Sequence, residues 1–362
     1  MAYTVEQCWH DTPGGTAVAA LEIVDELERF DDVDVHLVAG RHARPPVAPY
    51  APSGKVAMLP LARPWLYETW TRLNWPKVES VTGPVDVVHA TGLVPAATAA
   101  PLVVTLHDLA FLHTPEKFSR HGARLMRRSL DVMRSRADLV ICSSRATVDD
   151  CVDAGLPESR LRLVPLGVDG RRATPAEVEG VRRSLRLPER FVLFVGTIEP
   201  RKNLARLCAA MRTARLGATD GAMPLVVAGA GGWGDAWGET DPVVTDDVQF
   251  LGFVPDDQLR ALYAAATVFA YPSEREGFGL PVLEAMVQGT PVVTSRGTST
   301  EEVAGGAAVL VDPFDTDDIA RGIDDAVRSS ADLVERGRRR AAEMTWNAAA
   351  ERTRDVYREV RR

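Results

Sequence analysis

The feature that most constrains the fold of this chain is a repeated alternation of short apolar runs with segments of helical spacing. Continuous Val, Leu and Ile runs are typical of strands covered on both faces, as in parallel sheets. Residues 204–215 and 259–266 carry the spacing of amphipathic helices. The alternation therefore predicts an α/β fold with doubly wound domains. The expected strands are residues 33–38, 85–90, 102–106, 139–143, 161–166, 191–195, 225–228, 248–251, 268–271, 292–294 and 308–311.

A chain of 362 residues is long enough for two domains. The two series of strands separate near residues 169–188, a polar, Arg-rich stretch with two prolines that we interpret as a linker. We expect a first Rossmann-like domain over residues 1–170 and a second over residues 171–344. Residues 345–362 are expected to form a last helix, with Thr345 as its cap.

Charge and cysteine content exclude several classes of protein. The net charge is −8, and residues 1–170 hold 17 Lys and Arg against 21 Asp and Glu, so no basic domain for nucleic acid is expected. The four cysteines form no CxxC pair, which favours a reducing compartment over a zinc site or a disulfide framework. No signal peptide is evident, and no apolar run reaches the roughly 20 residues that span a bilayer. We therefore expect a cytoplasmic protein.

The loop at residues 196–203 directly follows an expected strand and begins with Gly196. Arg201 and Lys202 would lie in front of the next helix, with Asn203 as its cap. Two cations beside the positive end of a helix suit a diphosphate. A solvated Arg-Lys turn is the alternative, and this loop by itself does not decide between them.

The loop after residues 268–271 is the more specific signal. Residues 276–279 place two glycines ahead of a helix that we expect to begin at Pro281, which makes an anion-binding turn. Glu284 would fall in the first turn of this helix, where its carboxylate can accept hydrogen bonds from a pair of ribose hydroxyls. The alternative, that Glu284 only favours the helix dipole and Glu276 is an exposed loop acid, is the weaker interpretation. A third loop, residues 252–257, could line a nucleobase.

Together these loops resemble the retaining glycosyltransferases of family 4, which have the GT-B fold. The resemblance covers residues 191–326, about a third of the chain, and its matches occur in the expected order. The matching segments are Gly196-Thr197-Ile198-Glu199-Pro200-Arg201-Lys202-Asn203, Gly229-Ala230-Gly231-Gly232-Trp233, Phe250-Leu251-Gly252-Phe253-Val254, the Glu-x7-Glu run from Glu276 to Glu284, residues 289–295 and Glu302-Val303-Ala304-Gly305.

The resemblance implies two Rossmann-like domains facing a central cleft, with the C-terminal helix crossing back to the first domain. It implies that Arg201 and Lys202 hold the donor diphosphate, that Glu276 faces the donor sugar and that Glu284 binds the ribose. The other residues that it assigns to donor binding are Gly15, Gly196, Phe253, Val254, Gly277, Phe278, Gly279 and Leu280.

The first domain carries two less specific matches. Pro13-Gly14-Gly15-Thr16 resembles the family's Gly-rich loop, and Thr105-Leu106-His107-Asp108-Leu109 resembles its strand-end His motif, which implies that His107 lies close to the sugar. A Gly-Gly pair before a helix is common in α/β proteins, and a lone histidine is more often structural. Trp9, His10 and the Pro-rich residues 41–64 are expected to shape the acceptor site.

The resemblance also implies a mechanism in which the catalytic residues are His107, Arg201, Lys202 and Glu276. The acceptor attacks the front face of the donor sugar with retention of configuration, and the leaving phosphate takes the acceptor's proton. No cofactor and no metal are expected. Two Asp-x-Asp segments, residues 32–34 and 315–317, have the spacing of a metal motif, but we interpret them as a turn and a helix start.

The expected partners are a nucleotide diphosphate sugar and a glycan, lipid or small-molecule acceptor. The motifs are most similar to those of mannosyltransferases, so GDP-mannose is the first donor to consider, followed by UDP-glucose and UDP-N-acetylglucosamine. The alternatives are a GT-B epimerase, which would need no acceptor, a phosphorylase, which would need a lysine for pyridoxal phosphate that we do not identify, and a non-catalytic nucleotide-binding protein.

Residues 120–136 form a basic segment with helical spacing. Leu125, Ser129, Val132 and Met133 would lie broadly on one face, with most arginines elsewhere. We prefer the interpretation as an ordinary surface helix. The alternative is weak peripheral contact with the inner face of an anionic membrane, since related enzymes with lipid acceptors dock through such helices.

Overall fold

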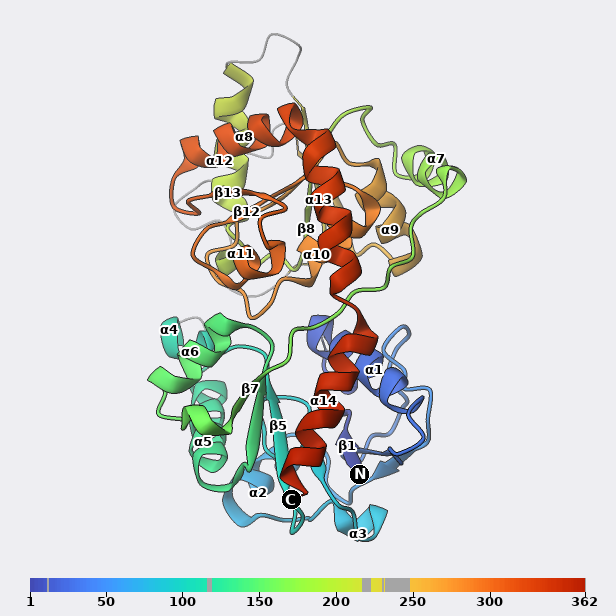
Figure 1. Cartoon of the computed structure of the whole chain (residues 1–362), viewed down its shortest axis with the longest axis vertical. Helices are drawn as coiled ribbons and strands as arrows, with labels where there is room; N and C mark the ends of the chain where they lie inside the picture. Colours follow the sequence, from blue (N-terminus) through green and yellow to red (C-terminus); the bar gives the residue numbers. More distant parts are fainter. Residues whose placement is uncertain (12, 116–118, 217–222, 230, 232–247, 362) are drawn as a thin grey trace. The chain divides into compact units, whose positions relative to one another are not determined.

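The computed structural model describes residues 1–11, 13–115, 119–216, 223–229, 231 and 248–361. The chain divides into two units, and Figure 1 shows that each is built of a sheet and helices. Unit 1 is Met1–Gly167 together with Trp346–Arg362, and unit 2 is Val168–Thr345. The expected domain boundaries lie a few residues from these.

Unit 1 is built on a seven-stranded parallel sheet in the order β3-β2-β1-β4-β5-β6-β7. The strand order reverses between β1 and β4. The carboxyl ends of these two strands therefore form the topological switch point, where α/β proteins bind ligands. The strands are β1 (Ala2–Thr4), β2 (His36–Ala39), β3 (Val56–Met58), β4 (Val88–Ala90), β5 (Leu102–Leu106), β6 (Leu139–Cys142) and β7 (Leu161–Leu163).

Helices cover both faces of this sheet (Figure 1). Since side chains alternate along a strand, Val104 and Leu106 of β5 enter a core with Trp70 and Met133, while Thr105 lies on the opposite face. The helical elements of unit 1 are η1 (Glu6–Trp9), α1 (Gly14–Leu27), α2 (Trp65–Leu73), α3 (Glu79–Thr82), α4 (Ala110–His113), α5 (Arg120–Arg136), α6 (Arg145–Asp153), η3 (Glu158–Arg160) and α14 (Trp346–Val360).

Helix α14 returns to unit 1 after the whole of unit 2, as the resemblance implied. It packs against α1 and reaches the sheet through a buried polar chain. His89 of β4 lies 2.6 Å from the Tyr357 hydroxyl through Nδ1 and 2.7 Å from the Thr105 hydroxyl through Nε2. Burial lowers the pKa of His89 to about 3, so the ring is neutral and each nitrogen has one partner.

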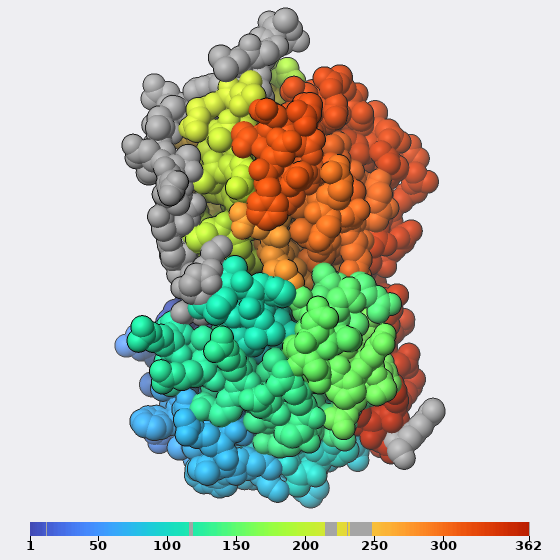
Figure 2. Space-filling model, turned by 90° about the vertical axis from the view of Figure 1, so that its left-hand side faces the viewer, coloured from blue at the N-terminus to red at the C-terminus, as the bar shows by residue number. Residues whose placement is uncertain are grey.

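The basic segment forms α5, with the Ser119 hydroxyl accepting from the Gly122 amide at its start. Its buried face is centred on Leu130 and Met133, and Leu125 lies less deeply than expected. Arg124 is exposed, and the surface of α5 is visible in the teal part of Figure 2. This packing agrees with an ordinary surface helix, while membrane contact stays a prediction. Each helix within the described ranges is too short or too polar to cross a bilayer.

Unit 2 contains a six-stranded parallel sheet in the order β10-β9-β8-β11-β12-β13. Its strands are β8 (Val192–Val195), β9 (Leu225–Ala228), β10 (Val248–Gly252), β11 (Val268–Tyr271), β12 (Val292–Ser295) and β13 (Val309–Val311). Its helical elements are α7 (Pro175–Ser184), η4 (Pro200–Lys202), α8 (Leu204–Leu216), α9 (Asp256–Ala265), α10 (Leu280–Gln288), α11 (Ser299–Ala304), α12 (Thr316–Arg328) and α13 (Ser330–Glu343).

The interpretation of residues 169–188 as a linker is wrong for much of that stretch, which forms α7. The Thr174 hydroxyl accepts from the Glu177 amide, and the Glu177 carboxylate accepts from the Thr174 amide. Pro175 lies in the first turn, where its missing N–H costs nothing. This capping box starts the helix in spite of the polar composition, and α7 then packs against α9.

Two strands were not expected from the sequence, β1 and β3. Each has three residues, too few to show a period, and β3 lies inside the Pro-rich stretch at residues 41–64 that we assigned to an acceptor loop. The structure places β3 at the edge of the sheet beside β2, so part of that stretch has a structural role.

The buried contact between Tyr357 and His89 predicts a measurable stability effect. Tyr357→Phe leaves one buried ring nitrogen of His89 without a partner, so we expect the free energy of unfolding to fall by about 1–3 kcal/mol in urea titrations at pH 7.5. Glu359→Gln is the matched control, because it removes a surface ion pair between α14 and Arg162 of β7. The control should cost less than about 1 kcal/mol. Equal losses in both variants would contradict the prediction.

Candidate active site

Two loops of unit 2 meet because the strands before them are neighbours. β8 and β11 are parallel and adjacent, with Val268 opposite Val192 and Phe269 opposite Leu193. The sheet order reverses between them, so their carboxyl ends form the switch point of unit 2. Residues 196–203 leave β8 at this edge and residues 272–279 leave β11 there. The strand order therefore brings together residues that lie more than seventy positions apart.

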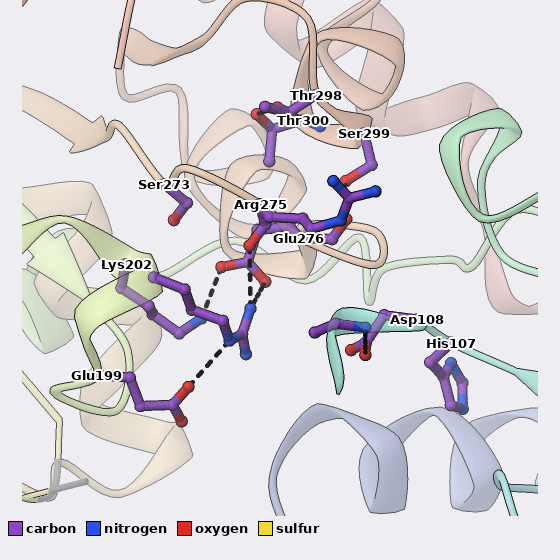
Figure 3. A network of polar contacts seen from close by, with 12 residues as sticks. His107, Asp108, Glu199, Lys202, Ser273, Arg275, Glu276, Thr298, Ser299 and Thr300 are labelled. Atoms are coloured by element: carbon purple, nitrogen blue, oxygen red, sulfur yellow. Dashed lines mark hydrogen bonds and ion pairs between the residues drawn. The ribbon is translucent and has the colours of Figure 1, made fainter. Parts of the chain in front are cut away.

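The Glu276 carboxylate is the centre of this site. Its Oε2 accepts a hydrogen bond from Arg201 Nη1 at 2.8 Å, and its Oε1 accepts one from Lys202 Nζ at 3.0 Å. The Lys202 and Glu276 side chains are 10% and 8% exposed. In Figure 3 the two side chains point toward one another across the loop ends. The sequence-predicted residues Arg201, Lys202 and Glu276 thus form one ion cluster.

Two further side chains hold the cations of this cluster. Glu199 Oε2 accepts from Arg201 Nε at 2.9 Å, and Arg201 Nη1 also donates to the carbonyl of Arg275 at 3.1 Å. Lys202 Nζ donates to the Tyr271 hydroxyl, which in turn donates to Glu276 Oε1 at 2.9 Å. Glu199 and Tyr271 were not among the predicted site residues. The sequence signal that could have identified them is their position at or just after the end of a strand.

The charges in the cluster hold one another in the ionised state. Burial alone would raise the pKa of Glu276, but Arg201 and Lys202 outweigh it and lower that pKa to about 2. Burial alone would lower the pKa of Lys202, but Glu276 and Tyr271 raise it above its ordinary value. The cluster therefore keeps two fixed cations at neutral pH, each oriented by a carboxylate.

The glycine turn lies next to this cluster because Gly277 follows Glu276 directly. Gly279 has φ +111°, and a Cβ there would lie 2.7 Å from Thr300 Cγ2, so only glycine fits. The Ser299 hydroxyl donates to the Glu276 carbonyl at 2.7 Å and holds the turn against α11. Helix α10 begins at Leu280, so the amides of residues 277–280 lie at its positive end.

Gly196, at the end of β8, is also required by its surroundings. Its φ is +150°, and a Cβ there would lie 3.0 Å from Lys202 Cδ, so a side chain would crowd the cluster lysine. Asn203 is not the side-chain cap that we expected for α8. It has φ +62°, its amide donates to the carbonyls of Pro272 and Pro313, and its oxygen accepts from Arg206. It ties the two loops together instead.

Glu284 lies on α10, in its second turn rather than its first, because the helix begins one residue before Pro281. Its Oε2 accepts a hydrogen bond from the Tyr263 hydroxyl of α9 at 2.7 Å. The third loop follows β10, where Phe253 is 62% exposed and Val254 is buried. Of the segment Gly229 to Trp233, the residues Ala230, Gly232 and Trp233 lie outside the described part of the chain.

The two predicted residues of unit 1 lie at the carboxyl edge of its own sheet. Gly15 is in the first turn of α1, which follows β1 and η1, and His107 directly follows β5. The carbonyl of His107 accepts from the Ser143 and Thr147 hydroxyls, which fixes its backbone. Burial lowers the pKa of the His107 ring, so the imidazole is neutral at pH 7.

Trp9 and His10, which we assigned to the acceptor site, contact other residues at the same edge. The Trp9 ring stacks on His42 at 4.6 Å between centroids, and His10 Nε2 lies 3.0 Å from the Tyr67 hydroxyl. His42 in turn lies 3.1 Å from the Glu6 carboxylate. His42 lies within residues 41–64, which we assigned to the acceptor site, whereas Glu6 was not predicted.

In the portion of the chain described here, no group of three or more His, Cys, Asp or Glu side chains is placed to hold a metal ion. Asp315 is the cap of α12, as expected, and accepts from the amides of Asp317 and Asp318. Asp32 pairs with Arg354 and Arg358 of α14.

Sequence comparison gives matches over both units. Residues 180–344 match the family described as glycosyl transferases group 1, and residues 13–172 match glycosyltransferase family 4. The chain is 34% identical over 267 residues to O-antigen chain mannosyltransferase B of Escherichia coli, covering 70% of this chain and 69% of that protein. It is 31% identical to an MMP alpha-(1->4)-mannosyltransferase of Mycolicibacterium hassiacum over 305 residues, which cover 76% and 71%. It is also 33% identical to a D-inositol 3-phosphate glycosyltransferase of Salinispora tropica, with 72% and 59% covered.

Among solved structures, sucrose-phosphate synthase from Thermosynechococcus elongatus has the same fold, with a TM-score of 0.75, 21% identity and coverage of 99% of this chain and 98% of that one. The two parallel sheets, the returning C-terminal helix and the matched residue ranges all indicate the same family. This chain belongs to the family 4, or group 1, glycosyltransferases and has the GT-B fold.

Proposed function

We propose that this chain transfers a hexosyl residue, with mannose as the first candidate, from a nucleoside diphosphate sugar to a hydroxyl group of a glycan, lipid or small-molecule acceptor. The observation that carries the proposal is the pair of fixed cations, Arg201 and Lys202, beside the glycine turn at residues 277–279. Cations and amides gathered at two neighbouring strand ends suit a diphosphate.

The proposed chemistry places negative charge where these groups lie. The bond between the anomeric carbon and the diphosphate oxygen breaks, and the electron pair leaves with the diphosphate. Arg201, Lys202 and the turn amides would stabilise this charge more in the transition state than in the ground state. The acceptor oxygen forms the new bond, and its proton passes to the leaving phosphate. We assign Glu276 and His107 to the side of the donor sugar, and Glu284 to the ribose.

The donor is inferred from the relatives. Two of those named above are mannosyltransferases, which supports GDP-mannose as first candidate. The relative named for inositol 3-phosphate keeps other nucleotide sugars open, so UDP-glucose and UDP-N-acetylglucosamine come next. We propose a reaction without cofactor or metal, in the cytoplasm. Weak contact of α5 with an anionic membrane stays a prediction of the sequence.

A ligand screen tests the proposal most directly. We expect each nucleotide sugar that binds to raise the melting temperature of the protein, because its diphosphate would contact Arg201 and Lys202 and its ribose would contact Glu284. GDP-mannose should raise it most, because two of the relatives are mannosyltransferases. Chromatography of the bound sugar nucleotide should then show slow hydrolysis to GDP and mannose. Stabilisation by NAD alone would overturn the enzyme class. Conversion of the nucleotide sugar to an isomer would favour an epimerase instead.

Removing either cation should slow the reaction strongly. We expect Arg201→Ala and Lys202→Ala to lower kcat/KM for the donor by on the order of 10²-fold or more, because each removes charge stabilisation of the leaving diphosphate. Arg212→Ala, which removes an exposed arginine from α8, should keep the wild-type value. Near-normal kinetics in both cluster variants would remove the electrostatic assignment.

The configuration of the product is a separate test. We expect the anomeric configuration of the donor to be retained, as measured by NMR on the product, because we propose front-face attack. The reaction should run unchanged in EDTA. An inverted anomer would contradict the attack geometry. Loss of activity in EDTA, with recovery on adding Mg²⁺ or Mn²⁺, would contradict the proposal of metal independence.

A further inference from the structure

Tyr263 of α9 makes a contact that the proposed chemistry does not use. Its hydroxyl donates to Glu284 Oε2 at 2.7 Å. The residue is 1% exposed, and its ring packs edge-on against Phe269 at 5.3 Å between centroids. The carbonyl of Tyr263 accepts from the Thr290 hydroxyl at 2.6 Å. Ring and backbone are therefore both held by neighbours, with the hydroxyl at hydrogen-bond distance from Glu284.

The contact changes what the Glu284 carboxylate can do. Burial raises the pKa of Glu284, Asp256 adds to that rise, and the hydrogen bond from Tyr263 opposes both. Within the described residues, Oε2 accepts this hydrogen bond, and Oε1 accepts no hydrogen bond from another residue. A donor on one oxygen favours the ionised carboxylate and fixes the plane of the group.

Two hydroxyls on adjacent carbons can be bound by an ionised carboxylate whose plane is fixed. The 2′ and 3′ hydroxyls of a ribose can both donate to one ionised carboxylate, whereas a protonated or rotated one accepts fewer hydrogen bonds. Tyr263 lies on α9, which packs against α10, and does not belong to the Arg201–Lys202–Glu276 cluster, whose own tyrosine is Tyr271. Its effect should therefore fall on nucleoside binding and not on bond breaking.

We propose that Tyr263 is a positioning residue for the nucleoside half of the donor: its hydroxyl holds Glu284 in the orientation that receives the ribose diol. This inference rests on the proposed function, in which Glu284 binds the ribose. It adds a selectivity for ribonucleotides over nucleotides without the diol, set by a residue that does not itself touch the sugar.

The test compares two ligands that differ only in the diol. GDP and 2′,3′-dideoxy-GDP are titrated into the full chain by calorimetry, and the same pair of uridine nucleotides is used alongside. We expect Tyr263→Phe to weaken binding of the ribonucleotide about tenfold, as for one hydrogen bond to a charged group, and to leave the dideoxy nucleotide within about twofold. The KM for the nucleotide sugar should rise by a similar factor while kcat changes little.

Two variants make the result decisive. Thr290→Val removes the hydrogen bond to the Tyr263 carbonyl but leaves the Tyr263 hydroxyl in place. Any loss of affinity should therefore be equal for both nucleotides. Glu284→Gln should abolish the preference for the ribonucleotide. Equal weakening of both nucleotides by Tyr263→Phe, or no weakening, overturns the inference.

The same titrations separate this inference from the proposed function. If the wild type prefers the ribonucleotide, and Glu284→Gln removes that preference while Tyr263→Phe does not, the proposed function stands and only the role of Tyr263 fails. If the wild type binds both nucleotides equally, or binds neither, the assignment of Glu284 to the ribose fails and the role of Tyr263 fails with it.

Discussion

The site of unit 2 depends on one carboxylate, that of Glu276, shared between Arg201 and Lys202. Each of its oxygens faces one cation, and the mutual stabilisation outweighs the cost of burial, which is why the pKa of Glu276 falls to about 2. Removing any one of these three ionised groups would leave an unpaired charge in a partly buried site, which is unfavourable. The arrangement therefore holds the cations at fixed positions before any ligand arrives, as electrostatic stabilisation of a leaving group requires.

Much of the architecture follows from the sequence. The runs at residues 102–106, 225–228 and 268–271 form β5, β9 and β11 with the expected bounds, because continuous apolar runs in a doubly wound protein are typical of strands covered on both faces. The loops that carry Arg201, Lys202 and Glu276 could be predicted for the same reason, since ligands bind beyond the carboxyl ends of such strands.

What the sequence leaves out is the order of the strands and the contacts between helices. That β8 and β11 are neighbours, although β9 and β10 lie between them in the chain, decides that Arg201 meets Glu276. The role of Tyr263 depends on how α9 packs against α10, which no local pattern encodes. Helix α7 is a different case, because Thr174 and Glu177 did carry a capping signal and the polar composition obscured it.

The returning helix α14 has a consequence for how the chain is made. Unit 2 is one continuous segment, Val168–Thr345, whereas unit 1 needs residues 346–360 to cover α1 and to supply Tyr357 to His89. A ribosome synthesises residues 1–167 first, yet the helix that packs against α1 and β6 emerges only after all of unit 2. The unit whose synthesis begins first is therefore the unit whose chain is completed last.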